Sequence, residues 1–132
     1  MTQKRVAIIA SNGGLDSAYK VLNIATAAAA TDAEVAIFFT FEALAIIHRD
    51  AATMLTMGSG KEHYAEGFKR ANVPSISDLL EIATESGVRM IACQMTMDVT
   101  GMTQDMFIDG VEVGGAVTFL DFAYDADVTV TF

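Results

Sequence analysis

The stretch VAIIASNGG, residues 6–14, decides the fold of this chain. Its first five residues form a continuous apolar run, which is typical of a strand buried on both faces, and the Ser-Asn-Gly-Gly that follows predicts a tight turn. The next apolar positions recur at helical spacing in an alanine-rich segment, so we expect a helix over about 15–31. A second β-branched and aromatic run at 35–41 completes a βαβ unit, whose crossover is almost always right-handed.

The rest of the chain continues this alternation after residues 42–72, which we interpret as a partly helical insertion above the strand ends. A helix follows Pro74, where Ser75 and Asp78 have the spacing of a capping box. Gly87 suits the position just past the end of that helix. The elements expected beyond it are a strand over 88–93, a helix over 96–106 with Thr96 as N-cap, a strand over 111–113, a helix over 115–124 and a strand over 128–132.

Strands that alternate with helices predict an α/β fold: a single-domain three-layer sandwich, flavodoxin-like, with a mostly parallel five-stranded sheet. The 132 residues have the size of one domain and contain neither an internal repeat nor a linker rich in proline or serine, so we expect residues 1–132 to form one unit. In such folds ligands bind beyond the carboxyl ends of the strands, which is where functional side chains are expected.

Composition argues against several classes of function. The chain has 8 Lys and Arg against 17 Asp and Glu, and this formal charge of −9 disfavours binding to nucleic-acid backbones or anionic lipid. Its 52% of hydrophobic residues argues against a disordered chain. The longest apolar stretch, 35–47, has about 13 residues where a membrane-spanning helix needs about 20. We therefore expect no nucleic-acid partner and no membrane span.

The chain has one cysteine and two histidines, which bears on the cellular compartment and on whether the protein binds a metal. Cys93 is the only cysteine and cannot form an intramolecular disulfide, and the first residues lead into a short apolar strand rather than a secretory signal, so we expect a cytoplasmic protein. The two histidines, His48 and His63, match no structural zinc spacing and are expected on the solvated surface. We expect no metal and no cofactor.

Cys93 is the first candidate for chemistry. It is expected where a strand ends and a helix begins, and there backbone N–H groups and the helix dipole lower the pKa of a thiol and make the thiolate available. Two observations oppose this interpretation: a lone cysteine is more often a small buried hydrophobe, and Asp98 disfavours a nearby anion. The chemistry therefore requires a sulfur that reactants can reach and that electropositive groups hold.

The loop after the first strand supports an alternative. The sequence GGLDS at 13–17 resembles most of the Ser-Gly-Gly-x-Asp-Ser loop with which ATP pyrophosphatases hold a pyrophosphate at a helix N-terminus. Asp16 opposes an anion, and a purely structural interpretation is a strand-to-helix turn in which Asp16 or Ser17 satisfies first-turn donors. A nucleotide- or flavin-binding module that uses this loop is the second hypothesis.

Five segments carry a resemblance to a known family. They are CQMTMDVTGM at 93–102, DGVEVGG at 109–115, the region from Thr118 to Asp127, SNGGLD at 11–16 and FFTF at 38–41. Together they resemble the DsrE/DsrF/DsrH-like sulfur-transfer family, in particular its branch often labelled peroxiredoxin family protein. The resemblance covers nearly the whole chain except about 45–72, where the insertion is shortened and more charged, and Glu42 stands where a tryptophan is common.

The resemblance implies a DsrEFH-like α/β fold with a parallel sheet and a tendency to form homo-oligomers. It also implies a cysteine that accepts sulfur as a persulfide and passes it to another carrier, and Cys93 aligns with that cysteine. Peroxidase chemistry fits poorly, because a peroxidase cysteine needs a resolving thiol and this chain has a single cysteine.

We therefore predict a cytoplasmic sulfur carrier, a sulfurtransferase-like relay rather than a turnover enzyme. It would take sulfane sulfur from a rhodanese-like or TusA-like protein and yield it to an acceptor thiolate. The high apolar content favours a subunit interface in a homo-oligomer. A scaffold subunit with an inert cysteine is the third hypothesis. The residues expected to form the site are Cys93 as the sulfur carrier, the backbone N–H groups of Thr96, Met97 and Asp98 as anion donors, and Asn12, Gly13 and Gly14 at the mouth of the pocket.

Overall fold

A five-stranded sheet forms the centre of the computed structural model, which describes residues 3–132. All neighbouring strands are parallel, in the order β4-β3-β2-β1-β5, which confirms the expected α/β fold. The carboxyl ends of β1, β2 and β3 therefore lie side by side at one edge of the sheet. The strands are β1 (Arg5–Ala10), β2 (Glu34–Phe39), β3 (Arg89–Cys93), β4 (Glu112–Gly114) and β5 (Val128–Thr131).

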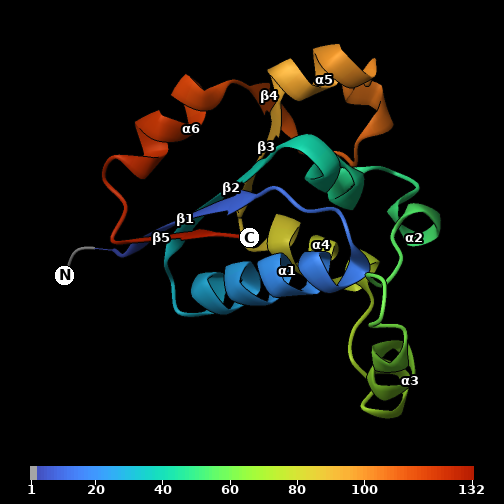
Figure 1. Ribbon diagram of the computed structural model, residues 1–132. Helices are drawn as coiled ribbons and strands as arrows, with labels where there is room; N and C mark the ends of the chain where they lie inside the picture. Colours follow the sequence, from blue (N-terminus) through green and yellow to red (C-terminus); the bar gives the residue numbers. More distant parts are fainter. Residues whose placement is uncertain (1–2) are drawn as a thin grey trace.

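Helices cover both faces of the sheet and give the molecule three layers (Figure 1). On one face lie α1 (Leu15–Ala30) and α4 (Ile76–Glu85), and on the other lies α6 (Ala116–Ala123). The helix α5 (Gln94–Thr100) follows β3 directly and stands above the carboxyl edge. No helix within residues 3–132 combines the length and the apolar character that crossing a membrane requires.

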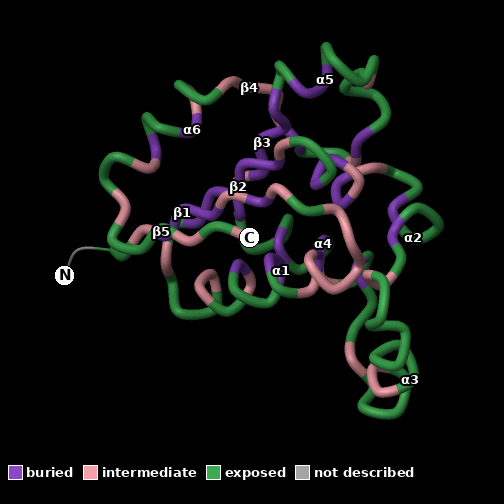
Figure 2. Tube along the Cα trace, in the orientation of Figure 1, coloured by how far each residue is buried: buried purple, intermediate pink, exposed green. Residues whose placement is uncertain are grey.

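Two hydrophobic cores lie on the two faces of the sheet. The larger one packs the strands against α1 and α4 and includes the fully buried Ile8, Leu22 and Ile37. The smaller one lies under α6, where the ring of Phe38 stacks on that of Phe119 with centroids 5.4 Å apart. Figure 2 shows the central strands buried and much of α6 exposed. Burial on both faces explains why the central strands are continuous apolar runs.

The helix α4 begins as the sequence predicts. Ser75 Oγ accepts the N–H of Asp78 at 3.1 Å, and Asp78 Oδ2 accepts the N–H of Ser75 at 3.4 Å, so the capping box is present. The second bond is long because the aspartate side chain is shorter than the glutamate preferred there. Gly87 follows the helix in a left-handed conformation, φ +80°.

The insertion at 42–72 is partly helical, as expected. It contains α2 (Ala51–Met54), α3 (His63–Arg70) and all but the first residue of the 3₁₀ helix η1 (Phe41–Ile47). Ile46 and Ile47 of η1 are fully buried, so the first part of the insertion belongs to the larger core. By contrast, α3 has no buried residue and projects from the body of the molecule (Figure 1).

The expected strand over 35–41 is too long at its carboxyl end. β2 ends at Phe39, because Phe41 adopts a left-handed backbone, φ +52°, and opens η1. Sequence pattern alone favours a strand through this aromatic run, and the tertiary turn overrides it.

The helix after β3 also differs from its expected bounds. It begins at Gln94 with Cys93 as N-cap, so the expected start at Thr96 is wrong. It ends at the left-handed Gly101, φ +77°, and a separate 3₁₀ helix, η2 (Gln104–Met106), follows. A left-handed glycine ends a helix, which is why the expected single helix to 106 is two pieces.

Candidate functional site

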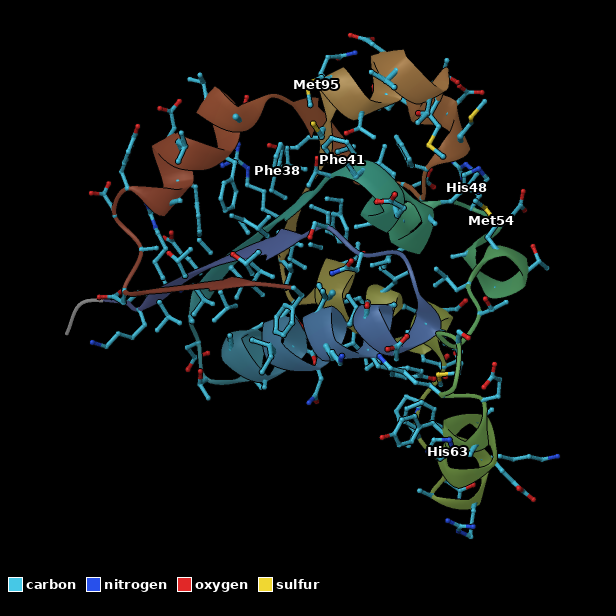
Figure 3. The ribbon with its side chains drawn as sticks, viewed as in Figure 1. Phe38, Phe41, His48, Met54, His63 and Met95 are labelled. Atoms are coloured by element: carbon cyan, nitrogen blue, oxygen red, sulfur yellow. The ribbon has the colours of Figure 1, made fainter. Side chains whose placement is uncertain are left out.

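A cavity of about 510 Å³ opens at the carboxyl edge of the sheet. The loop after β1, the helix η1 after β2 and the helix α5 after β3 form its walls. Glu42 is the one ionisable residue among those that line it, so the cavity suits an apolar or cationic group better than an anion. Figure 3 shows Met95 and Phe41 at this edge of the molecule. The lining residues are Gly13, Gly14, Phe41, Glu42, Ala45, Met95, Thr96, Val99, Thr100 and Met102.

Cys93 lies directly beside this cavity but does not line it. It is the last residue of β3 and the N-cap of α5, and it pairs with Gly114 of β4. Cys93 belongs to the smaller core with Phe38 and Phe119 and keeps 4% of its surface exposed. With so little of the residue exposed, a reactant reaches its sulfur only after a local movement.

The surroundings of Cys93 act on its pKa in both directions. Burial raises the pKa of the thiol, whereas hydrogen bonds from the Thr96 hydroxyl and N–H, the Thr40 hydroxyl and the Met95 N–H lower it. The lowering prevails, so the pKa of Cys93 lies below that of an ordinary cysteine. The Cys93 side chain makes no capping hydrogen bond with the first N–H groups of α5, so these N–H groups act mainly on the thiolate, the charged form of the side chain. A lower pKa increases the thiolate fraction at neutral pH.

Two threonine hydroxyls that act on the pKa of Cys93 are candidate site groups that sequence reasoning missed. Thr96 is 3% exposed, and its Oγ1 accepts the N–H of Phe41 at 3.1 Å and lies 3.3 Å from Thr40 Oγ1. One signal points to Thr40: it directly follows β2, as Cys93 ends β3, and these strands are parallel neighbours. Residues at the ends of adjacent parallel strands meet at the same edge.

Among the three residues expected as backbone anion donors, Thr96 acts on the thiol of Cys93. Met97 is buried in the larger core. Asp98 is exposed, and its Oδ1 accepts Gln94 Nε2 at 2.9 Å. Because α5 begins at Gln94 rather than at Thr96, the backbone N–H groups that act on Cys93 are those of Met95 and Thr96.

The glycine loop reaches the same cavity from β1. Gly13 and Gly14 line it, whereas Asn12 is not among the lining residues. A Cβ atom on Gly13 would lie 2.3 Å from the carbonyl oxygen of Glu42, so no side chain fits between this loop and η1. The glycine is needed for this close backbone approach.

A carboxylate occupies the helix end that the nucleotide hypothesis assigns to phosphate. Asp16 Oδ2 lies 2.9 Å from Lys61 Nζ, and hydrogen bonding to Lys61 is the main reason why the pKa of Asp16 is lowered. The N–H of Leu15 donates to the carbonyl of Thr56 at 2.8 Å. A phosphate at this position would meet the Asp16 charge and would lack this donor.

Neither histidine lines this cavity, and Figure 3 shows the two in different parts of the molecule. His63 is exposed on α3, as expected. The expectation of a solvated surface is wrong for His48, whose side chain is 15% exposed and whose Nδ1 accepts the N–H of Asp50 at 3.0 Å. Within residues 3–132, no three His, Cys, Asp or Glu side chains gather as ligands for a metal ion.

Comparison with solved structures agrees with this architecture. The YchN protein of E. coli superposes with a TM-score of 0.73 at 25% sequence identity, over 99% of this chain and 100% of that protein. The protein of unknown function MTH1491 of Methanobacterium thermoautotrophicum superposes with a TM-score of 0.69 over 97% of this chain and 99% of that protein. Its 16% identity shows a shared fold alone.

Comparison of sequences identifies the family. The sulfur carrier protein DsrE2 of Allochromatium vinosum is 37% identical over a 155-residue alignment that covers 97% of this chain and 98% of that protein. The uncharacterized protein YrkE of Bacillus subtilis is 28% identical, with 96% of each chain covered. The family model of the DsrE/DsrF/DrsH-like proteins matches residues 2–64 and 51–131. The chain therefore belongs to the DsrE/DsrF/DrsH-like family.

Proposed function

We propose that this protein is a cytoplasmic sulfur carrier that holds sulfane sulfur as a persulfide on Cys93. The observation that carries the proposal is the position of Cys93 beside the carboxyl-edge cavity, with two hydroxyls and two N–H groups that lower its pKa. The 37% identical relative named as a sulfur carrier supports the same chemistry. A single cysteine also fits a reducing compartment.

The proposed reaction is a pair of thiol exchange steps. The Cys93 thiolate attacks the outer sulfur of a donor persulfide, an S–S bond forms at Cys93, and the donor leaves as a thiolate with the electron pair of the broken S–S bond. An acceptor thiolate then attacks the outer sulfur and Cys93 leaves as a thiolate. Each step breaks one S–S bond and forms another, so neither step needs an oxidant or a reductant.

The single cysteine also shapes the relay. Because this chain has no second thiol, a persulfide on Cys93 is not resolved to an intramolecular disulfide and persists until an external thiolate arrives. We propose a rhodanese-like or TusA-like protein as the donor.

Because Cys93 is buried, a sulfur donor must first gain access to its sulfur. Met95 lines the cavity, is 57% exposed and has an unbranched, flexible side chain. We propose that its displacement by the incoming sulfur donor uncovers Cys93. On this basis Met95→Ala increases the rate of sulfur uptake.

Mass spectrometry of the intact protein tests the proposal. After incubation with a sulfane-sulfur donor, such as an alkyl persulfide, the wild-type protein should gain about 32 Da per sulfur, and a thiol should remove it. Cys93→Ser should gain nothing. Absence of the added mass on the wild type with several donors, at pH values up to 9, would overturn the proposal.

The nucleotide or flavin hypothesis has one supporting observation, since Gly13 and Gly14 line the cavity. The Asp16 carboxylate opposes it. Thermal shift with ATP, AMP and FMN separates the hypotheses: a rise in Tm that survives Cys93→Ser and disappears in Gly14→Val would favour the nucleotide module. The third hypothesis, an inert scaffold cysteine, predicts no response in either experiment and slow alkylation of Cys93.

We also propose that the protein is a homo-oligomer that buries the outer side of α6. Val117 of this helix is 72% exposed and its C-cap residue Tyr124 is 76% exposed, and exposed apolar side chains of this kind favour a subunit contact. Sedimentation should give a multiple of 14.0 kDa. Val117→Asp with Tyr124→Asp should shift it to the monomer, whereas Ile82→Asp on α4 should not; a monomeric wild type would refute this.

A further inference from the structure

Glu42 brings an unpaired negative charge to the carboxyl-edge cavity. It is the one ionisable residue among those that line the cavity, and no Lys, Arg or His side chain in the described part of the chain forms an ion pair with it. The next basic residues along the chain, Arg49 and Lys61, pair instead with Asp109 and Asp16. A carboxylate without a counterion beside an apolar cavity attracts a cation from solution.

Phe41 lines the same cavity with an aromatic ring that has no partner. The residue is 55% exposed. In the part of the chain that the structure describes, its ring neither pairs with another aromatic ring nor lies below a guanidinium, as the ring of Phe122 does. Its φ of +52° is a left-handed conformation, and such strain is commonly found where it serves function. A free aromatic face attracts an organic cation.

The other walls of the cavity suit the carbon body of a ligand better than an anion. Met95 and Met102 contribute thioether side chains, which are flexible and polarisable and adapt to the shape of a ligand. The hydroxyl of Thr100, which also lines the cavity, already donates to the carbonyl of Thr96 at 2.7 Å. The volume of about 510 Å³ lies in the range of small-molecule sites.

The N-terminus of α1, beside the cavity, would favour an anion, but a carboxylate already occupies it. Gly14 is the N-cap of α1 and lines the cavity. Asp16 lies in the first turn of this helix, and its Oδ1 is 2.7 Å from the position that a Cβ atom on Gly14 would take. An anionic ligand would therefore approach a carboxylate at this wall as well as at Glu42.

We infer that the carboxyl-edge cavity binds a small organic cation, an ammonium group on an apolar carbon body, with the Phe41 ring and the Glu42 carboxylate as the groups that select its charge. Met95, Met102 and Val99 would contact the carbon body. The inference goes beyond sulfur transfer, because it concerns the cavity rather than the thiol. The site does not depend on whether Cys93 carries sulfur.

The test compares three probes with similar carbon chains and different charge. Hexyltrimethylammonium is the cation, hexyl sulfate is the anion and heptanol is uncharged. The NMR shifts of isotope-labelled methionine methyl groups give the Kd of each probe, with the Met95 and Met102 signals assigned from Met95→Leu and Met102→Leu. The cation should bind the wild-type protein about tenfold more tightly than heptanol, and hexyl sulfate should bind more weakly than heptanol.

Two variants test the groups that select the charge. Glu42→Gln and Phe41→Leu should each weaken binding of the cation about two- to fivefold and change binding of heptanol less than about twofold. Glu81→Gln on α4 and Tyr64→Leu on α3 are the matched controls, because they remove a carboxylate and a 51% exposed aromatic ring that do not line this cavity. Both controls should bind the cation like the wild type.

Equal affinities of the wild type for the cation and the anion would overturn the inference, and so would the absence of any Met95 or Met102 shift with the cation. A cation affinity that neither Glu42→Gln nor Phe41→Leu changes would also overturn it. If Phe41→Leu does not fold by circular dichroism, Glu42→Gln and the anionic probe decide the matter.

The outcome is separate from that of the proposed function, since no probe carries sulfane sulfur and Cys93→Ser should show the same preference for the cation. A protein that binds the cation and takes up no sulfur would keep this site and refute the carrier. Sulfur uptake without a preference for the cation would refute this site alone.

Discussion

At the residue scale, the chemistry of this site depends on the polar groups that act on the pKa of a single thiol. Cys93 is buried, and burial alone would raise the pKa of its thiol. Neutral hydroxyl and N–H donors reverse that effect without a cation, since none of the residues lining the adjoining cavity is basic. Donors of this kind stabilise a thiolate without attracting bulk anions. The N–H of Phe41, a residue with a left-handed backbone, donates to the hydroxyl oxygen of Thr96.

The strain at Phe41 can be measured with two truncations that remove the same aromatic ring. Phe41→Gly should be more stable than Phe41→Ala by about 1 kcal/mol, because glycine adopts positive φ without the steric cost that alanine keeps. Urea unfolding of the two variants gives the difference. Phe41 is 55% exposed, so loss of packing is similar in both. An alanine variant more stable than the glycine variant would contradict the left-handed backbone.

At the scale of elements, the site depends on how closely three chain segments approach one another. The loop after β1 touches the backbone of η1 at Gly13, and the insertion returns to α1 through the ion pair of Asp16 with Lys61. Both contacts lie at the carboxyl edge. They hold the walls of the cavity without contributing groups to the sulfur chemistry.

Gly13→Ala should destabilise the protein by about 1–3 kcal/mol, because its Cβ would lie 2.3 Å from a backbone oxygen and one segment must move. Gly67→Ala is the control, since the nearest atom to its Cβ is the Arg70 guanidinium at 3.9 Å and alanine favours the helix. We expect that control to be neutral or more stable. Chemical denaturation measures both, and equal stabilities would argue against the close approach.

Asp16 gives a pH dependence with a defined sign. Its pKa in the folded protein is lowered, chiefly by the hydrogen bond with Lys61, so its contribution to stability is complete above the unfolded pKa and is lost as pH falls through the folded value. Asp16→Asn should therefore cost about 1 kcal/mol at pH 7 and progressively less in acid. Denaturation at several pH values checks this.

The comparison variant for this measurement is Asp125→Asn. Asp125 also forms an ion pair, with Arg5 at 3.7 Å, but its side chain is 83% exposed. It should lose little stability at any pH. A loss in Asp16→Asn that stays constant down to pH 2 would show that shape, rather than charge, matters at this position.

At the scale of the whole molecule, charge should select among sulfur donors. The chain carries a net charge of −9, and Glu42 is the ionisable residue that lines the cavity. An anionic donor such as glutathione persulfide is repelled by both, whereas cationic cysteamine persulfide is attracted. We therefore expect uptake from cysteamine persulfide to be about 3–10 times faster at low salt, with the difference shrinking as salt screens the charges.

Glu42→Gln should reduce the preference for the cationic donor more than Glu81→Gln does. Glu81→Gln is the control because it removes the same charge from α4, which does not line the cavity. Mass spectrometry at short reaction times gives the rates. Equal rates for both donors at low ionic strength would exclude electrostatic selection.

The sequence by itself determined the alternation of elements, the parallel sheet and the α4 capping box, because these follow from local patterns: apolar runs, helical spacing and cap residues. It also pointed to Cys93 and to the glycine loop, since residues after parallel strands meet at one edge. Only the tertiary structure decided that Cys93 is buried, that Asp16 fills the helix end and that the hydroxyls of Thr40 and Thr96 lie 3.3 Å apart. Those properties depend on which side chains from distant segments come within hydrogen-bond distance, and no local pattern encodes a distance between Thr40 and Thr96. For the same reason the left-handed turn at Phe41 overrides an aromatic run that favours a strand.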